Sequence, residues 1–146
     1  MGTPQEAVVR QCLALFHSTG QPDLARIAPL FAEDATYHAL VPRGPVHRGR
    51  AAVLAELGLQ FSRYDECHCE ILAMASTQRH VFTERRDHVS MHKAARRIYS
   101  SVNAVFELDE QLRIVAWREY WDAGDIARQL GITVEQLDQH MLERHS

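Results

Sequence analysis

The spacing of apolar residues changes near Cys67 from a helical to a strand pattern, and this change constrains the fold more than any other feature. Before it, apolar residues recur three or four positions apart, which predicts helices over residues 4–17, 24–31 and 49–61. After it, the pattern predicts strands over residues 67–75, 80–91, 96–108 and 112–122. The polar links between these strands are short, so we expect an antiparallel meander rather than βαβ units.

The remaining elements are a short strand and two terminal helices. Residues 35–41 are expected to form the strand, which Pro42 ends, and Gly131 separates expected helices at residues 123–130 and 133–143. Helices that precede a meander are typical of an α+β fold, with the helices packed on one face of a curved sheet. We therefore expect one domain over residues 1–146, a cone with an internal cavity, composed of a core at 4–122 and a C-terminal helical hairpin at 123–146.

The longest predicted strand, at residues 96–108, has two different faces. The face expected to point inward carries mostly apolar residues, namely Ile98, Ser100, Val102, Ala104, Phe106 and Leu108. The opposite face is polar except for Tyr99 and Val105. A partly apolar outer face of this kind suits a homodimer formed sheet to sheet.

Composition and charge limit the possible partners. With 46% hydrophobic and 24% charged residues the chain resembles an ordinary soluble domain, and no segment approaches the roughly 18 apolar residues of a membrane span. The first residues show no secretory signal, so we expect a cytoplasmic protein without a membrane partner. A formal charge of −3 argues against a nucleic-acid partner, and the segment 125–137, which resembles a helix-turn-helix core, is acidic. We interpret that segment as a packing hairpin at the mouth of the cone.

The cysteines do not form a recognisable metal or disulfide framework. Cys67 and Cys69 flank His68 in a predicted strand, Cys12 lies far away in the sequence, and no second ligand cluster follows. We expect reduced thiols, no metal site and no cofactor.

Two strands place ionisable and aromatic residues on common faces. Arg85 and Asp87 alternate in one strand, and Glu119 lies between Trp117 and Trp121 in another, so each set shares a strand face. If both faces line one pocket, two carboxylates and a guanidinium meet there, which suits acid/base chemistry on a small apolar molecule. The alternatives are an exposed charge pair and tryptophans that belong only to the core.

Three segments carry a family resemblance. Residues 30–35 (LFAEDA), 81–87 (VFTERRD) and 117–122 (WREYWD), in this order and spacing, resemble limonene-1,2-epoxide hydrolases. More broadly they resemble the SnoaL-like and NTF2-like (cystatin-like) cone fold. The likeness runs from the first helix to about Asp122.

The resemblance implies roles for individual residues. Asp87 would protonate an epoxide oxygen, Arg85 would bridge the two acids, and Glu119 stands where an aspartate that activates water is expected. Tyr37 matches a tyrosine that positions the water, whereas Ala39 stands where an asparagine is expected. The residues expected to contact substrate are Trp117, Ala39, Val89, Val102 and Trp121. Repulsion in a dry pocket would keep Asp87 protonated, while hydrogen bonds would favour an ionised Glu119.

Glu119 and Ala39 depart from the family pattern in the half of the site that handles water, so three functions stay open. The first is one-step hydrolysis of a small apolar epoxide by general acid/base catalysis. The second is a SnoaL-like cyclase or a ketosteroid-isomerase-like enzyme, because ketosteroid isomerase also keeps one aspartic acid neutral. The third is a protein that binds a small molecule without reaction, since one fold serves many functions.

Overall fold

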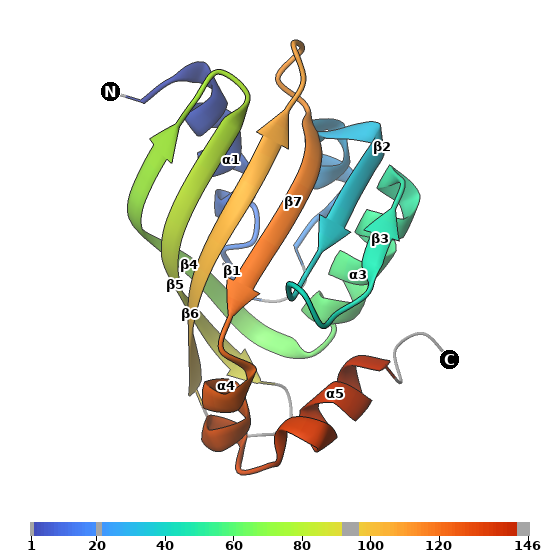
Figure 1. The fold of residues 1–146 in the computed structure, drawn as a ribbon, viewed down its shortest axis with the longest axis vertical. Helices are drawn as coiled ribbons and strands as arrows, with labels where there is room; N and C mark the ends of the chain where they lie inside the picture. The colour runs from blue at the N-terminus through green and yellow to red at the C-terminus, as the bar shows by residue number, and fades with distance from the viewer. Residues whose placement is uncertain (1, 20–21, 92–96, 143–146) are drawn as a thin grey trace.

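The structure, a computed structural model, describes residues 2–19, 22–91 and 97–142 of the 146-residue chain. Its main feature is a curved seven-stranded sheet with the strand order β1-β4-β5-β6-β7-β2-β3 (Figure 1). In chain order from β1 to β7, the strands are Ser18–Thr19, Phe31–His38, Val46–Arg48, Tyr64–Ser76, His80–Met91, Arg97–Leu108 and Ile114–Trp121.

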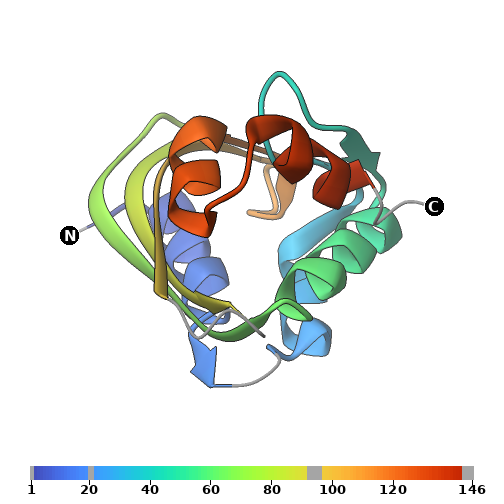
Figure 2. The same cartoon turned by 90° about the horizontal axis from the view of Figure 1, so that it is seen from below.

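Helices cover the concave side and one end of this sheet. α1 and α3 lie on the concave side, and α4 and α5 lie at the end reached by the last residues of β7 (Figures 1 and 2). The helices are α1 (Pro4–Ala14), α2 (Leu24–Ile27), the 3₁₀ helix η1 (Ala28–Leu30), α3 (Arg50–Phe61), α4 (Ala123–Leu130) and α5 (Val134–Leu142). Within the described residues, no helix has the length and apolar character needed to cross a membrane. The predicted α+β class and NTF2-like arrangement are confirmed.

Local sequence signals set the ends of the helices. Thr3 caps α1 by accepting a hydrogen bond from the backbone N–H of Glu6, and Pro4 occupies the first helical turn. Asp122 caps α4 in the same way, through the N–H of Asp125. Gly131 ends α4 in the left-handed region, with φ 71°, where a residue without Cβ is least strained.

The predicted meander is confirmed for the four long strands. β4, β5, β6 and β7 pair antiparallel in sequence order. The two faces of β6 also divide as expected, because Val102, Ala104 and Phe106 are buried whereas the side chain of Tyr99 is exposed. The predicted strand start at residue 96 and the hairpin residues 143–146 lie outside the described residues.

The prediction was wrong around the first strand of the N-terminal half. The helix expected over residues 24–31 ends at Leu30. β2 begins at Phe31 and runs through Glu33 and Asp34, which lie before the strand expected at residues 35–41. Long-range pairing explains the difference, because β2 pairs in parallel with β7 and antiparallel with β3. The register of the β2–β7 pair shifts between Phe31 and Thr36, and the acids at 33 and 34 stay exposed beside this irregularity.

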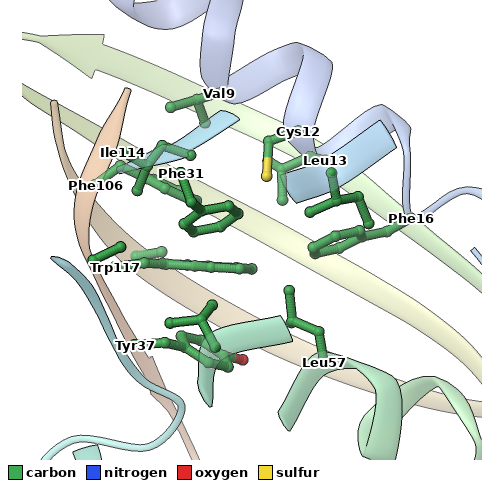
Figure 3. Packing of buried hydrophobic residues seen from close by; sticks show 14 of the residues in the cluster. Val9, Cys12, Leu13, Phe16, Phe31, Tyr37, Leu57, Phe106, Ile114 and Trp117 are labelled. Carbon is green, nitrogen blue, oxygen red and sulfur yellow. The ribbon is translucent and has the colours of Figure 1, made fainter. Parts of the chain in front are cut away.

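The largest buried cluster lies between the concave face and the helices, with Trp117 at its centre (Figure 3). The indole packs against four rings, two of them from β2, at centroid distances of 4.5 Å to Tyr37, 5.1 Å to Phe106, 5.7 Å to Phe16 and 6.2 Å to Phe31. Rings at these separations stabilise a core beyond the area that they bury. This packing fixes the position of the β7 side chains that follow Trp117.

Candidate active site

Arg85 and Asp87 form a closely held ion pair on the inner face of β5. The guanidinium donates from Nε to Asp87 Oδ1 at 3.0 Å and from Nη2 to Asp87 Oδ2 at 2.7 Å. The Arg85 side chain is only 2% exposed, compared with 15% for Asp87. The pair is therefore buried, unlike the exposed ion pairs on protein surfaces, which contribute little to stability.

Glu119 reaches the same guanidinium from β7, two strands away. Its Oε2 lies 2.8 Å from Arg85 Nη2 and accepts a hydrogen bond from Trp117 Nε1 at 3.0 Å. The intervening strand β6 makes this approach possible, because its inward residue opposite Glu119 is Ala104, whose side chain is small. The structure thus brings together Arg85, Asp87, Glu119 and Trp117, which sequence patterns had placed in two separate segments.

Burial and charge shift the protonation of this group. Burial disfavours the charge on Arg85, but Glu119 and Asp87 outweigh it and raise the pKa of the guanidinium well above its usual value. Burial is also the largest influence on Glu119 and raises the pKa of its carboxyl; Arg85 opposes the shift and Asp87 adds to it. This direction favours a proton on Glu119, where the sequence had led us to expect an ionised carboxylate.

Tyr37 on β2 and Ala39, just beyond the end of that strand, lie beside this group. Tyr37 is paired in register with Trp117 and packs on its indole, while its hydroxyl accepts a hydrogen bond from Gln60 Nε2 of α3 at 3.1 Å. Ala39 is buried, and its carbonyl accepts a hydrogen bond from Trp121 Nε1 at 2.7 Å. Trp121 packs against a second cluster formed by Leu40 and the terminal helices, so its indole N–H supports the C-terminal part of the fold.

The two predicted valines lie on the inner face near the ion pairs. Val102 is buried and stands in register with Arg85 on one side and Trp121 on the other. Val89 is half-buried and follows Asp87 by two residues, so it shares the inner face of β5. We keep as a proposal the predicted contact of Val89 and Val102 with a substrate.

Three polar residues near Tyr37 were not identified from the sequence. Glu56 and Gln60 lie on α3, and His47 lies on β3 opposite Tyr37. A signal existed, because positions 53, 56, 57, 60 and 61 share one helical face on which 53, 57 and 61 are apolar. Polar residues at 56 and 60 on that face indicate a buried polar contact.

Two buried thiols adjoin the ion pairs. Burial raises the pKa of Cys12 to about 12. The pKa of Cys69 is raised well above its usual value, first by a hydrogen bond with Cys67 and then by burial. Both thiols therefore stay protonated near neutral pH and pack as small apolar groups. Among the described residues, no set of three or more His, Cys, Asp or Glu side chains is arranged to hold a metal ion.

Comparison with solved structures shows the same fold in several proteins. One is a protein with a ketosteroid isomerase-like fold from Catenulispora acidiphila, solved in complex with trimethylamine: TM-score 0.77, 18% identity, covering 92% of this chain and 98% of that one. Another is an LEH-like epoxide hydrolase from M. tuberculosis: TM-score 0.73, 23% identity, 93% and 96% coverage. A third is SalBIII, an epoxide hydrolase/cyclase-like enzyme in pyran ring formation of the polyether salinomycin: TM-score 0.72, 20% identity, 83% and 92% coverage. At these identities the likeness shows the fold alone.

Sequence comparison gives the family. No curated protein matches the chain. The family profile of the SnoaL-like domain, however, matches residues 9–117, which include the last six residues of α1, both residues of the Arg85–Asp87 pair and Trp117. That match extends over well more than half of the chain and agrees with the curved sheet and its concave helices. The chain therefore belongs to the SnoaL-like domain family.

Proposed function

We propose that this protein is an epoxide hydrolase that adds water to a small apolar epoxide in one step, without a cofactor. The observation that supports this most is the guanidinium of Arg85 between two acids, 2.7 Å from Asp87 and 2.8 Å from Glu119. A reaction that opens an epoxide needs a proton donor for the oxygen and a base for the water at the same time. Two acids that hold one proton between them supply both.

We assign the donor role to Glu119 and the base role to Asp87, the reverse of the roles implied by the resemblance. Burial favours the protonated form of Glu119, and both of its hydrogen bonds converge on Oε2, so Oε1 is the oxygen that carries the transferable proton. Asp87 is more exposed and is held by two N–H groups of Arg85, an arrangement that favours a carboxylate.

Each step of the proposed reaction balances in protons and bonds. Glu119 gives its proton to the epoxide oxygen as one C–O bond breaks. Asp87 takes a proton from the water whose oxygen forms the new C–O bond. The product is a vicinal diol, and the proton gained by Asp87 replaces the one lost by Glu119 when the two acids re-equilibrate.

The first test is a set of terpene-like, cyclic and aliphatic epoxides in oxygen-18 water, with the diol followed by mass spectrometry. Diol that carries one labelled oxygen supports hydrolysis. A product of unchanged mass supports the SnoaL-like cyclase or isomerase, which the methyl side chain of Ala39 favours because it offers no hydrogen bond to a water. If the protein binds a small molecule but does not convert it, the third function, a small-molecule-binding protein, is supported. All three functions require an internal cavity, which stays a prediction.

Asp87→Asn is expected to lower the rate of diol formation by about 10²–10⁴-fold, because it removes the base. Sodium azide should partly rescue this variant, since azide attacks an epoxide carbon without first losing a proton, and the product is an azido alcohol protonated by Glu119. Azide should not rescue Glu119→Gln, which lacks the proton donor. If azide rescued only Glu119→Gln, Glu119 would be the base and Asp87 the proton donor, as the resemblance implies.

We also propose a homodimer formed through the outer face of the sheet. Phe82, Tyr99 and Tyr120 project from the outer face with 44%, 46% and 42% exposure, and burial of such a face would remove apolar area from water. Tyr120→Glu is expected to shift the protein from dimer to monomer in light scattering coupled to size exclusion, while the exposed outer-face substitution Glu84→Gln should not. A wild-type monomer at all tested concentrations would contradict the dimer.

A further inference from the structure

Two buried polar side chains on the inner face of β5 each leave one atom without a hydrogen bond. Thr83 is 4% exposed, and the side chain of Arg85, two residues further along the same face, is 2% exposed. Neither Thr83 Oγ1 nor Arg85 Nη1 has a hydrogen-bond partner among the residues that the structure describes. Because buried N–H and O–H groups are nearly always hydrogen-bonded, both atoms indicate a bound partner.

The contacts of Arg85 show on which side Nη1 lies. Nε and Nη2 both donate to Asp87, so the edge of the guanidinium between these two atoms faces Asp87. Since the guanidinium is planar, Nη1 lies away from that edge. Asp87 follows Arg85 by two residues on the inner face and Thr83 precedes it by two, so Nη1 lies on the side of Thr83. Nη1 and Thr83 Oγ1 thus face one region without a hydrogen bond to each other.

The neighbouring strands leave room in this region. In β6 the residue in register with Thr83 is Ala104, whose side chain is a single methyl group. In β4 the register shifts directly after Ile71, the partner of Arg85, which adds one residue to that strand at this level. The next residue, Leu72, is 48% exposed, so its side chain points away from the inner face. A single water, which needs little space and about two to four polar partners, suits such a region.

The surroundings favour an uncharged oxygen as the partner. The charge of Arg85 is already balanced by Asp87 and Glu119. Burial raises the pKa of Cys12 on α1 to about 12, and the charges of Arg85 and Glu119 also act on this thiol, so it lies near them and stays protonated. A water can accept a hydrogen bond from Nη1 and form another with the Thr83 hydroxyl, which both donates and accepts. Because both atoms are buried, an enclosed water suits them better than part of a larger ligand.

A water bound at Nη1 also accounts for the way in which Arg85 contacts Glu119. Arginine and a carboxylate often pair through two parallel hydrogen bonds. Arg85 pairs in this way with Asp87, but Glu119 contacts only Nη2, at 2.8 Å and through Oε2. A guanidinium whose Nη1 is held on the side of Thr83 cannot offer both terminal nitrogens to Glu119. Oε1 of Glu119 then receives no hydrogen bond from Arg85, as its proposed role in proton transfer requires.

We propose that Thr83 Oγ1 and Arg85 Nη1 bind one internal water, and that this water holds the guanidinium so that only Nη2 reaches Glu119. Thr83 is then a positioning residue, because it acts on the acid through the water and Arg85. The binding of the water is independent of the proposed function, whereas its effect on the reaction rests on that function. The test therefore combines measurements without a substrate and with one.

The first measurement counts long-lived internal waters by oxygen-17 magnetic relaxation dispersion and compares two substitutions. Thr83→Val keeps the shape of the side chain but removes the hydroxyl, and it is expected to bind one water fewer than the wild-type protein. Thr83→Ser keeps the hydroxyl and should retain the wild-type number. Equal numbers in the wild-type protein and folded Thr83→Val overturn the proposal.

Urea unfolding of Thr83→Val gives an independent result through the direction of the change. If the hydroxyl binds the water, the substitution leaves Nη1 without a partner and should lower the urea midpoint. If the buried hydroxyl has no partner, valine should instead raise the midpoint, because a buried polar group without a hydrogen bond is unfavourable. A raised midpoint therefore overturns the proposal.

A crystal structure of the wild-type protein tests the site without any substitution. Density for one isolated oxygen within hydrogen-bond distance of Thr83 Oγ1 and Arg85 Nη1 is expected. A direct hydrogen bond of Nη1 with Thr83 or with Glu119 would overturn the proposal, and so would density that continues into a larger ligand.

The last measurement uses an epoxide that the wild-type protein hydrolyses. Thr83→Val is expected to lower kcat by about 10-fold with KM within about twofold, because the guanidinium can then turn toward Glu119 and misplace the acid. Thr83→Ser, which keeps the water, should keep kcat within about threefold of the wild-type value. Loss of the water in Thr83→Val with unchanged kcat would overturn the positioning role. If the wild-type protein hydrolyses no epoxide, the proposed function fails, and the number of internal waters still decides whether the site exists.

Discussion

Glu119→Gln is expected to abolish turnover and at the same time to raise the free energy of unfolding at pH 8. Turnover should fall by about 10²–10⁴-fold, because an amide has no proton to give to the epoxide oxygen. The fold should persist, because the amide oxygen can still accept from Arg85 and Trp117. Loss of one of two negative charges beside a single buried guanidinium should stabilise the folded protein by about 1 kcal/mol at pH 8. A catalytic group that opposes stability is common in active sites.

The pH dependence of this gain follows from the direction of the pKa shift. The pKa of Glu119 is raised in the folded protein above its ordinary value of 4.5. The stability that protonated Glu119 contributes to the wild-type protein is therefore complete below that ordinary value and is lost as the pH rises through the folded value. Because glutamine does not titrate, the advantage of the variant should grow from about pH 4.5 upward and then become constant.

Urea unfolding of both proteins between pH 4 and pH 9 measures this difference. Glu84→Gln, on the exposed outer face of β5, is the control and should change stability by no more than about 0.5 kcal/mol. A variant that keeps wild-type turnover would exclude Glu119 as the proton donor. An advantage that decreases with rising pH would contradict the argument from burial.

The meeting of Arg85, Asp87 and Glu119 could be predicted because strand periodicity selects the faces. Side chains at 85 and 87 share one face of a strand, as do those at 117 and 119, and a meander brings the inner faces of its strands onto one surface. The family resemblance then gave the two segments a common role. What the pattern did not show is that Ala104 of β6 stands between Thr83 and Glu119 and leaves room for the contact.

Other features depend on long-range pairing that leaves little local signal. β1 has two residues and β3 has three, too few for a recognisable alternation. The parallel pairing of β2 with β7 joins segments far apart in the chain, and it extends β2 through Glu33 and Asp34. The contact between Gln60 and Tyr37 requires α3 to pack on β2, which no spacing in either segment predicts.

The direction of the pKa shift of Glu119 could not be predicted for a different reason. Both carboxyl groups face the same guanidinium, so their common neighbour does not distinguish them. The two acids differ in burial and in hydrogen bonding. Glu119 is the more deeply buried, and Asp87 accepts two hydrogen bonds from Arg85. These differences exist only in the packed protein.

Arg85→Met is expected to destabilise the protein by about 3–5 kcal/mol, the largest effect of any single substitution considered for stability. Arg85 is 2% exposed and is the charge partner of both acids, so its removal leaves two neighbouring carboxyl groups in a poorly hydrated region. Methionine fills much of the arginine volume, and the loss should therefore reflect charge more than packing. Arg86→Met, at the next position and on the exposed outer face, should change stability by no more than about 0.5 kcal/mol.

The destabilisation by Arg85→Met should increase with pH. Without the guanidinium, burial and the charge of Asp87 still raise the pKa of Glu119, and of the groups that lower it only the hydrogen bond from Trp117, the smallest influence, remains. A carboxyl whose folded pKa lies above its unfolded value stabilises the protein at low pH and loses this contribution as the pH rises. Adding Glu119→Gln to Arg85→Met should then recover part of the stability at pH 8 and less at pH 4, a coupling that urea unfolding of the two single variants and the double variant measures. Additive effects at both pH values would show that the two residues stabilise the fold independently, and the paired acids would then no longer account for the burial of Arg85.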